Sequence, residues 1–241
     1  MPFERAIIVG ASSGIGQEMV RQLAAGGTKV AALSRRLDRL EALAAEFPGL
    51  VLPYAADVTK TDGVPEQFAE IVRDLGGLDL FVYNAGSMTM FEEPTYDWPG
   101  DDNMIETNVT GATRWLNEAA ERFGAMGSGT LVGTGSVAGD RGRYLNPVYN
   151  ATKAYLHTYL ESMRNRLSKK GVRVVTIKPG PVWTEMTTHM KWKKAMAAPD
   201  AARIALAKME RGGEHYLSPI HWAAFKVIQF MPSAIFRKLE I

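Results

Sequence analysis

The chain has 241 residues, of which 46% are hydrophobic and 22% charged, so it has the composition of an ordinary globular protein with ample material for a core. Its 28 basic and 26 acidic residues leave a formal charge of +2, which excludes the strongly basic surface expected of a nucleic-acid-binding protein. The absence of cysteine excludes disulfides, thiolate metal sites and a cysteine nucleophile, and we expect a cytoplasmic protein without a metal site.

Short apolar runs alternate with helical patterns along the chain. The N-terminus leads straight into the first run, without the basic and long apolar segments of a signal peptide. Strand-like runs cover residues 5–9, 29–33, 50–54, 78–83, 129–133 and 173–177, and each is followed by ten or more residues with helical periodicity. Such repeated units predict a parallel sheet with helices on both faces. With no internal repeat and no linker, residues 1–241 are expected to form a single doubly wound α/β domain.

A glycine-rich turn follows the first predicted strand. Residues 10–16 read GASSGIG, and a helix is predicted from there to about residue 25. Glycines allow the backbone to turn tightly and to approach a pyrophosphate, whose charge the N–H groups at the helix start attract. The turn therefore predicts a dinucleotide site, although its spacing is G-x-x-x-G-x-G rather than G-x-G-x-x-G.

A tyrosine and a lysine four residues apart are the first candidates for chemistry. A helix predicted over residues 147–168 places Tyr149 and Lys153 one turn apart on the same face. A neighbouring cation lowers the pKa of a phenol, so Lys153 is expected to make Tyr149 a usable acid or base at neutral pH. Such pairs also arise by chance, so this interpretation depends on the rest of the chain.

The glycine spacing resembles the fingerprint of the short-chain dehydrogenase/reductase family, and the resemblance extends over nearly the whole chain. It implies a Rossmann-like fold and four catalytic residues, Asn108, Ser136, Tyr149 and Lys153. In such a site the tyrosine is the general acid or base, the serine positions the substrate oxygen, the lysine holds the ribose hydroxyls and the asparagine completes the proton path. The chain departs from the family pattern at Gly135, because the family commonly has two serines in a row there.

The resemblance also assigns a cofactor site. An acidic residue after the second strand would bind the ribose 2′-hydroxyl of NAD, whereas Arg35 there matches the 2′-phosphate of NADP. We therefore expect NADP(H), with Arg35 as the main contact and Ser12 or Arg36 assisting. The expected cofactor contacts are Gly10, Ser12, Ser13, Gly14, Ile15 and Gly16 in the turn, Ser34, Arg35 and Arg36 after the second strand, Asp57 and Val58 at the adenine, Asn84, Ala85 and Gly86 beneath the cofactor, the catalytic Tyr149 and Lys153, and Pro179, Gly180, Val182 and Thr184 near the nicotinamide.

Two segments in the C-terminal part of the chain indicate how the substrate and partner molecules bind. Residues 184–198 contain Trp192 and several methionines and are expected to form a mobile lid suited to an apolar substrate, although a surface helix without substrate contact fits equally well. Residues 219–241 form an apolar tail that is too short to span a bilayer. The tail could cover the pocket, pack in a subunit interface or lie on a membrane surface; we favour the first two, with a homodimer or homotetramer.

The sequence thus predicts an NADP(H)-dependent oxidoreductase that transfers a hydride between the nicotinamide and a carbonyl or secondary alcohol of a small molecule. One alternative is a sensor or scaffold that binds NADP without turnover, which would need Arg35 but not Ser136 and Tyr149. Another is a sugar-nucleotide epimerase or dehydratase, which shares the tyrosine and lysine but usually has a larger C-terminal domain than the residues after Pro179 provide.

Overall fold

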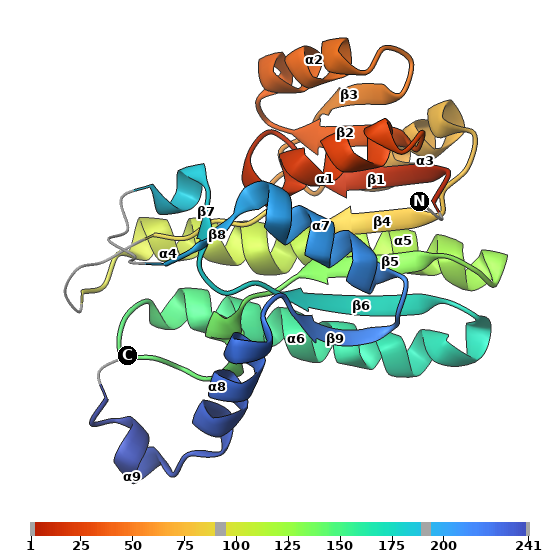
Figure 1. Cartoon of the computed structure of the whole chain (residues 1–241). Coiled ribbons are helices and arrows are strands. Elements are labelled where there is room, and N and C mark those ends of the chain that lie inside the picture. The colour runs from red at the N-terminus through yellow and green to blue at the C-terminus, as the bar shows by residue number, and fades with distance from the viewer. Residues whose placement is uncertain (1–2, 90–94, 189–193, 240–241) are drawn as a thin grey trace.

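A seven-stranded parallel sheet forms the centre of the molecule, with helices on both faces (Figure 1). The computed structural model describes residues 3–89, 95–188 and 194–239. The strand order is β3-β2-β1-β4-β5-β6-β9, and every neighbouring pair is parallel, which confirms the predicted doubly wound fold. The strands are β1 (Arg5–Val9), β2 (Lys29–Ser34), β3 (Val51–Ala55), β4 (Leu80–Tyr83), β5 (Thr130–Thr134), β6 (Arg173–Lys178) and β9 (Gly213–Tyr216), and the helices that accompany them are α1 (Gly14–Ala25), α2 (Leu37–Glu46), α3 (Val64–Leu75), α4 (Trp98–Ile105), α5 (Ala112–Met126), α6 (Pro147–Leu167) and α7 (Ala198–Met209).

The helices divide between two hydrophobic cores, one on each face of the sheet. Helices α1, α2 and α7 pack on one face, and α3, α5 and α6 pack on the other. Successive strand residues point to opposite faces, so Ile7 of β1 shares a core with Trp115 of α5, whereas Ile8 shares the other core with Leu23 of α1. These four side chains are at most 1% exposed, which explains why the strands are nearly continuous apolar runs.

The reversal of strand order beside β1 positions the site. From β1 the chain runs outward through β2 to β3, then returns to β4 on the other side of β1 and continues outward through β5 and β6 to β9. The connections after β1 and β4 therefore leave toward opposite edges of the sheet. In sheets of this type they open a crevice at the carboxyl ends of the strands, where ligands bind.

The six predicted strands begin and end within two residues of β1 to β6, and the helix predicted over residues 147–168 is α6. Sequence periodicity did not predict the two-residue strands β7 (Val182–Trp183) and β8 (Met196–Ala197), which pair with each other, or the π-helical segment η1 (Glu106–Gly111) between α4 and α5. Two-residue strands and a single π-helical turn are too short to produce a periodic pattern. The other short segments are η2 (Val137–Asp140), η3 (Ser168–Lys170) and η4 (Glu185–Thr187).

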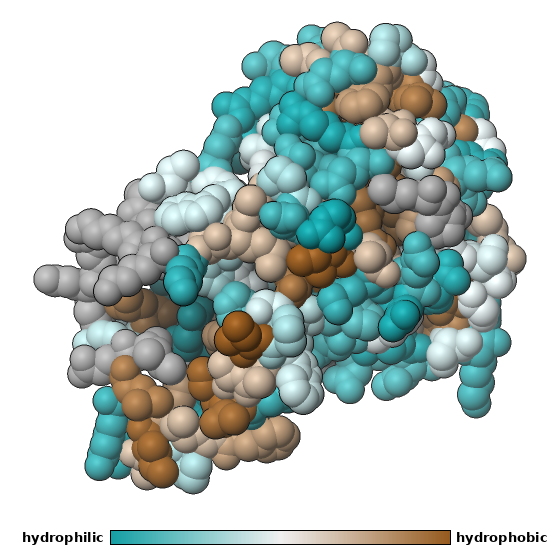
Figure 2. All heavy atoms as spheres, viewed as in Figure 1, coloured by the Kyte–Doolittle hydropathy of each residue, from teal (hydrophilic) through white to brown (hydrophobic). Residues whose placement is uncertain are grey.

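The apolar tail forms two helices, α8 (Pro219–Phe230) and α9 (Ser233–Phe236), which project from the sheet. Neither helix contains a buried residue, and Trp222 is 54% exposed and Phe230 81%. Figure 2 shows hydrophobic side chains gathered over this region. The Arg141 guanidinium lies 4.2 Å from the Phe236 ring centroid and donates to the carbonyl oxygens of Ile228 and Met231, so the tail has a defined path. No helix in the described part of the chain is long and apolar enough to cross a membrane.

Candidate active site

A cavity of about 530 Å³ lies at the carboxyl ends of the strands, between the glycine turn and α6. Every predicted cofactor or catalytic residue lines it, apart from Gly16 and Asn108. Both exceptions are buried just behind its wall. The structure thus brings together residues that are spread over most of the chain.

The glycine turn forms one wall because neighbouring backbone leaves no room for side chains. A Cβ atom on Gly10, whose φ is +85°, would lie 2.5 Å from the backbone nitrogen of Ala85. A Cβ atom on Gly16 would lie 2.2 Å from the Gly10 carbonyl oxygen, and Asn84 Nδ2 donates to that same oxygen at 3.2 Å. Gly16 therefore supports the turn from below, and Asn84 ties the end of β4 to it. The exposed backbone of the turn fits a pyrophosphate at the start of α1.

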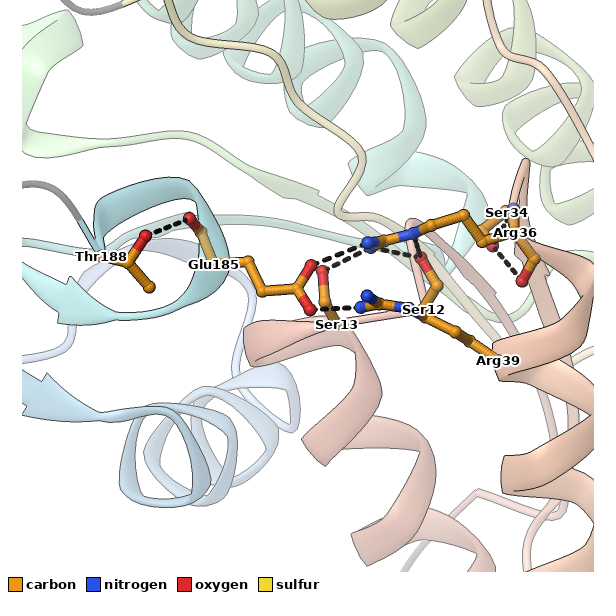
Figure 3. Close-up of polar contacts among 7 residues, drawn as sticks. All are labelled: Ser12, Ser13, Ser34, Arg36, Arg39, Glu185 and Thr188. Carbon is orange, nitrogen blue, oxygen red and sulfur yellow. Dashed lines mark hydrogen bonds and ion pairs between the residues drawn. The ribbon is translucent and has the colours of Figure 1, made fainter.

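The end of the cavity beyond β2 is dominated by Arg36 (Figure 3). Its Nη2 donates to the hydroxyl oxygens of Ser12 and Ser13, both at 2.9 Å, and its Nη1 forms an ion pair with Glu185 at 2.7 Å. Arg39 pairs with the same carboxylate. Hydrogen bonds from Arg36 and then Arg39 lower the pKa of Glu185, so this group carries its charge at neutral pH.

Arg35, which we expected to be the main phosphate contact, is oriented differently. It lines the cavity, but its side chain is exposed and makes no hydrogen bond to the described residues. It lies near Asp57: burial raises the pKa of Asp57, but hydrogen bonds from Thr59 and the charge of Arg35 outweigh this effect and lower it. In the structure, Ser12 and Ser13 therefore orient Arg36 rather than Arg35.

The opposite end of the cavity holds Ser136, Tyr149 and Lys153. The Ser136 hydroxyl accepts from the Ala138 N–H at 3.1 Å and hydrogen-bonds the Tyr149 phenol. Lys153 is 5% exposed, and its Nζ donates to the Thr134 carbonyl oxygen at 3.1 Å and lies 5.8 Å from the Tyr149 ring centroid. The three predicted catalytic side chains therefore meet in one place.

Burial dominates the electrostatics of this group. Burial raises the pKa of Tyr149, opposed by the hydrogen bond from Ser136 and by the charge of Arg143. The Lys153 ammonium, which the sequence predicts to lower this pKa, donates to the Thr134 carbonyl oxygen. Burial also lowers the pKa of Lys153, to about 8.

Asn108 lies behind the cavity wall and is 1% exposed. Its Nδ2 donates to the Ser87 carbonyl oxygen at 2.9 Å and to Thr152 Oγ1 at 3.1 Å, and its Oδ1 accepts from the Ser87 N–H at 2.8 Å. It belongs to η1, and π-helical turns of this kind are frequent at functional sites. Asn108 thus holds the loop after β4 against α6 beside Lys153.

A buried polar cluster behind Ser136 was not predicted from the sequence. Lys178 Nζ lies 2.6 Å from Asp140 Oδ1, and the Tyr216 hydroxyl donates to Asp140 Oδ2 at 2.8 Å. His157 Nε2 accepts from the Ser136 N–H at 3.4 Å, which places the ring proton on Nδ1, 3.8 Å from Asp140 Oδ1. Burial, with the charges of Lys178 and Lys153, lowers the pKa of His157, so the ring is neutral. The one clue in the sequence was Gly135, which stands where the family commonly has a serine. The structure gives a reason for the glycine, because a Cβ atom there would lie 2.4 Å from His157 Nε2.

Arg143 is a second feature of the cavity that was not predicted from the sequence. It belongs to the loop between η2 and α6, and it lines the cavity beside Tyr149. No pattern in a single sequence separates an arginine that faces a cavity from one that faces solvent.

The expected lid begins beside the glycine turn. A Cβ atom on Gly14 would lie 2.9 Å from the methyl carbon of Thr184, so the two sides of the cavity nearly touch there. Met186 and Thr187 also line the cavity. Residues 189–193, which include Trp192, lie outside the described residues.

A glycine turn at the reversal of a parallel sheet, with a hydrogen-bonded serine–tyrosine pair at the far end of the same cavity, defines the class: an oxidoreductase that uses a nicotinamide dinucleotide. Residues 4–195 match the sequence model of the family described as short chain dehydrogenase. An oxidoreductase from Myxococcus xanthus is 35% identical over 242 residues, which cover 98% of this chain and 96% of that protein. An oxidoreductase from Mycobacterium tuberculosis is also 35% identical, over 190 residues that cover 76% of this chain and 75% of the relative.

A solved structure agrees with these sequence matches. The short-chain dehydrogenase from Sphingobium yanoikuyae in complex with NADPH is 25% identical, with a TM-score of 0.82 over 96% of this chain and 98% of that one. The chain belongs to the short-chain dehydrogenase family.

Proposed function

We propose that the chain catalyses NADP(H)-dependent reduction of a carbonyl group in a small molecule, or oxidation of the corresponding secondary alcohol. The observation that carries the proposal is a single cavity that has Ser136, Tyr149 and Lys153 at one end and the glycine turn with Arg36 at the other. When bound, NADP(H) supplies or accepts the hydride.

Tyr149 is the proposed general acid in reduction. Burial keeps the pKa of the phenol high, so Tyr149 is protonated at neutral pH and can donate its proton to the substrate oxygen. Ser136, which hydrogen-bonds Tyr149 and is fixed by the Ala138 N–H, can hold the same oxygen. Lys153 is positively charged below its pKa of about 8, so in reduction it stabilises the phenolate left after proton transfer. In the oxidation direction the same cation favours the phenolate that accepts the proton.

We also propose NADP(H) rather than NAD(H). Arg35 and Arg36 line the cavity where β2 ends, a guanidinium matches phosphate geometry, and the Sphingobium relative was solved with NADPH. We assign Arg36 as the main contact for the 2′-phosphate, because Ser12 and Ser13 already orient its guanidinium toward the cavity.

A carbonyl screen that follows NADPH oxidation by absorbance tests this function. We expect turnover with at least one class of carbonyl, faster with NADPH than with NADH. A protein that binds NADPH but reduces none of the aldehydes, ketones and keto acids offered would instead fit a sensor or scaffold.

We further propose that residues 184–198 act as a substrate lid and that a second subunit covers the exposed face of α8 and α9. The cavity-facing Met186 and Thr187 support the first role, and the exposed Trp222 and Phe230 support the second. Deletion after Ser218 should reduce the subunit number measured by sedimentation. An unchanged subunit number, with binding to anionic vesicles that the deletion abolishes, would assign the tail to a membrane surface.

A further inference from the structure

Within residues 3–89, 95–188 and 194–239, Arg143 is a cation without a paired carboxylate at the reacting end of the cavity. It makes no hydrogen bond or ion pair with the described residues, and its Nε is buried and unbonded. Burial lowers its pKa, and the interaction with Tyr149 raises it. The guanidinium is therefore partly desolvated beside the phenol, and no carboxylate of the described residues pairs with it.

Such an arrangement is unfavourable by itself, because a buried polar group or charge normally requires a partner. The chain provides partners for other half-buried arginines. Arg36 binds Glu185, Arg141 binds carbonyl oxygens of the tail, and Arg164 donates to the Val174 carbonyl oxygen and to Thr176 Oγ1. The Arg143 guanidinium has no such partner among the described residues, which suggests that a ligand provides one.

That ligand is not an anion of the cofactor. The groups suited to its pyrophosphate and 2′-phosphate are the glycine turn and Arg36, at the other end of the cavity. Arg143 lies with Tyr149 and Ser136, where the substrate oxygen must be for proton transfer. An anion that meets Arg143 there belongs to the substrate.

Building on the proposed reductase function, we propose that the substrate is a carbonyl compound or alcohol that bears an oxyanion, a carboxylate or a phosphate, and that Arg143 binds this oxyanion. Guanidinium groups bind both kinds of oxyanion through paired N–H donors. Val137, next to Ser136, and Leu145, two residues from Arg143, also line the cavity, so the rest of the substrate meets apolar side chains there. Binding of the anion would also offset the Arg143 charge that lowers the pKa of Tyr149, which favours the protonated phenol needed for reduction.

The test compares matched substrates on the full-length protein with saturating NADPH. The set is a straight-chain keto acid, its methyl ester and a keto phosphate of similar length. We expect kcat/KM for at least one anionic substrate to exceed that of the ester by roughly 10- to 100-fold, as for a charge-assisted hydrogen-bonded pair. Arg143→Gln should reduce this ratio to near one, and Arg143→Lys should retain part of it. The relative rates of keto acid and keto phosphate identify the oxyanion.

Arg122→Gln is the matched control, because Arg122 also has a buried, unbonded Nε but does not line the cavity. It should leave the ratio unchanged. A second readout does not require turnover: non-reacting carboxylates and inorganic phosphate should raise the melting temperature of the NADP⁺ complex of the wild type and of Arg122→Gln, but not of Arg143→Gln.

The possible outcomes separate this proposal from the proposed function. Turnover of the ester at least as fast as of both anions, with a ratio that Arg143→Gln does not change, would refute the anionic substrate and leave the reductase intact. No NADPH oxidation with any substrate would refute the reductase, and the melting temperatures would then decide the anion site alone. Equal stabilisation of wild type and Arg143→Gln by the anions would overturn that site.

Discussion

The two ends of the cavity handle positive charge in opposite ways. At the adenosine end, Arg36 is held by Ser12, Ser13 and Glu185, so its charge is paired before any ligand arrives. At the reacting end, Arg143 has no such partner in the described part of the chain. The charge of Arg36 is therefore paired within the chain, whereas the charge of Arg143 is not paired by any described residue.

This difference shows how one cavity can treat its two ligands differently. A ligand at Arg36 must compete with a carboxylate of the chain itself, which weakens its net gain, whereas an anion at Arg143 meets a cation that nothing else neutralises. Changes at the adenosine end should therefore alter cofactor affinity and leave the chemistry unchanged. Changes at the reacting end should do the reverse.

The largest expected effect is at the reacting end. Tyr149→Phe keeps the ring but removes the transferable proton, so kcat should fall by roughly 10²–10⁴, as for lost general acid–base catalysis. Because Arg36 is unaffected, the NADPH dissociation constant should change little. Steady-state kinetics and fluorescence titration measure the two quantities, and near wild-type kcat in this variant would contradict the proposed mechanism.

The second effect is at the adenosine end. Arg36→Asp replaces the oriented guanidinium with a repelling charge, so the NADPH dissociation constant should rise roughly 10²-fold, as expected for a lost charge-assisted pair. Arg35→Asp should have a smaller effect, because the exposed Arg35 is not oriented by the two serines. NADH binding should weaken in neither variant. A larger loss in Arg35→Asp would restore the assignment made from the sequence.

The sequence predicted the backbone of this molecule better than its charges. The strands and the glycine turn follow from local patterns, because buried parallel strands need continuous apolar runs and only glycine fits where Gly10 meets Ala85. The residues that share the cavity also followed, through the family resemblance, and nearly all of them line it.

The details that the sequence could not determine depend on where the ends of long side chains lie. Arg35 and Arg36 are adjacent in sequence, yet Ser12, Ser13 and Glu185 from other elements decide which of them is oriented toward the cavity. Similarly, the effect of Lys153 on Tyr149 depends on the Thr134 carbonyl that binds the ammonium. Such choices arise from tertiary contacts that no single-sequence pattern encodes.

The third effect concerns the wall behind the reacting end, where His157 occupies the space that a side chain at position 135 would need. Gly135→Ser should destabilise the fold by about 1–3 kcal/mol, because its Cβ atom would lie 2.4 Å from His157 Nε2. His157→Ala removes the ring, so the double variant should be more stable than the sum of the single effects predicts. Urea unfolding of the four proteins measures this coupling, and strict additivity would contradict it.

The smallest effect tests whether Glu185 competes with the cofactor. Its carboxylate binds Arg36 and Arg39, is 49% exposed, and lies where it would repel a 2′-phosphate bound to the same guanidinium. Glu185→Gln keeps the size of the side chain and removes the charge. We expect the NADPH dissociation constant to fall a few-fold and the NADH constant to stay unchanged, because a half-exposed ion pair contributes little by itself.

Glu46→Gln provides the control for this substitution, because Glu46 pairs with Arg21 in a similar two-point contact and Arg21, unlike Arg36, does not line the cavity. It should leave both dissociation constants unchanged. The gain in Glu185→Gln should also shrink as salt is added, since the repulsion it removes is partly screened. Weaker NADPH binding in Glu185→Gln would instead mean that the carboxylate holds Arg36 in place for the phosphate. Glu185 would then not compete with the 2′-phosphate for Arg36, and the two ends of the cavity would differ only in how their arginines are oriented.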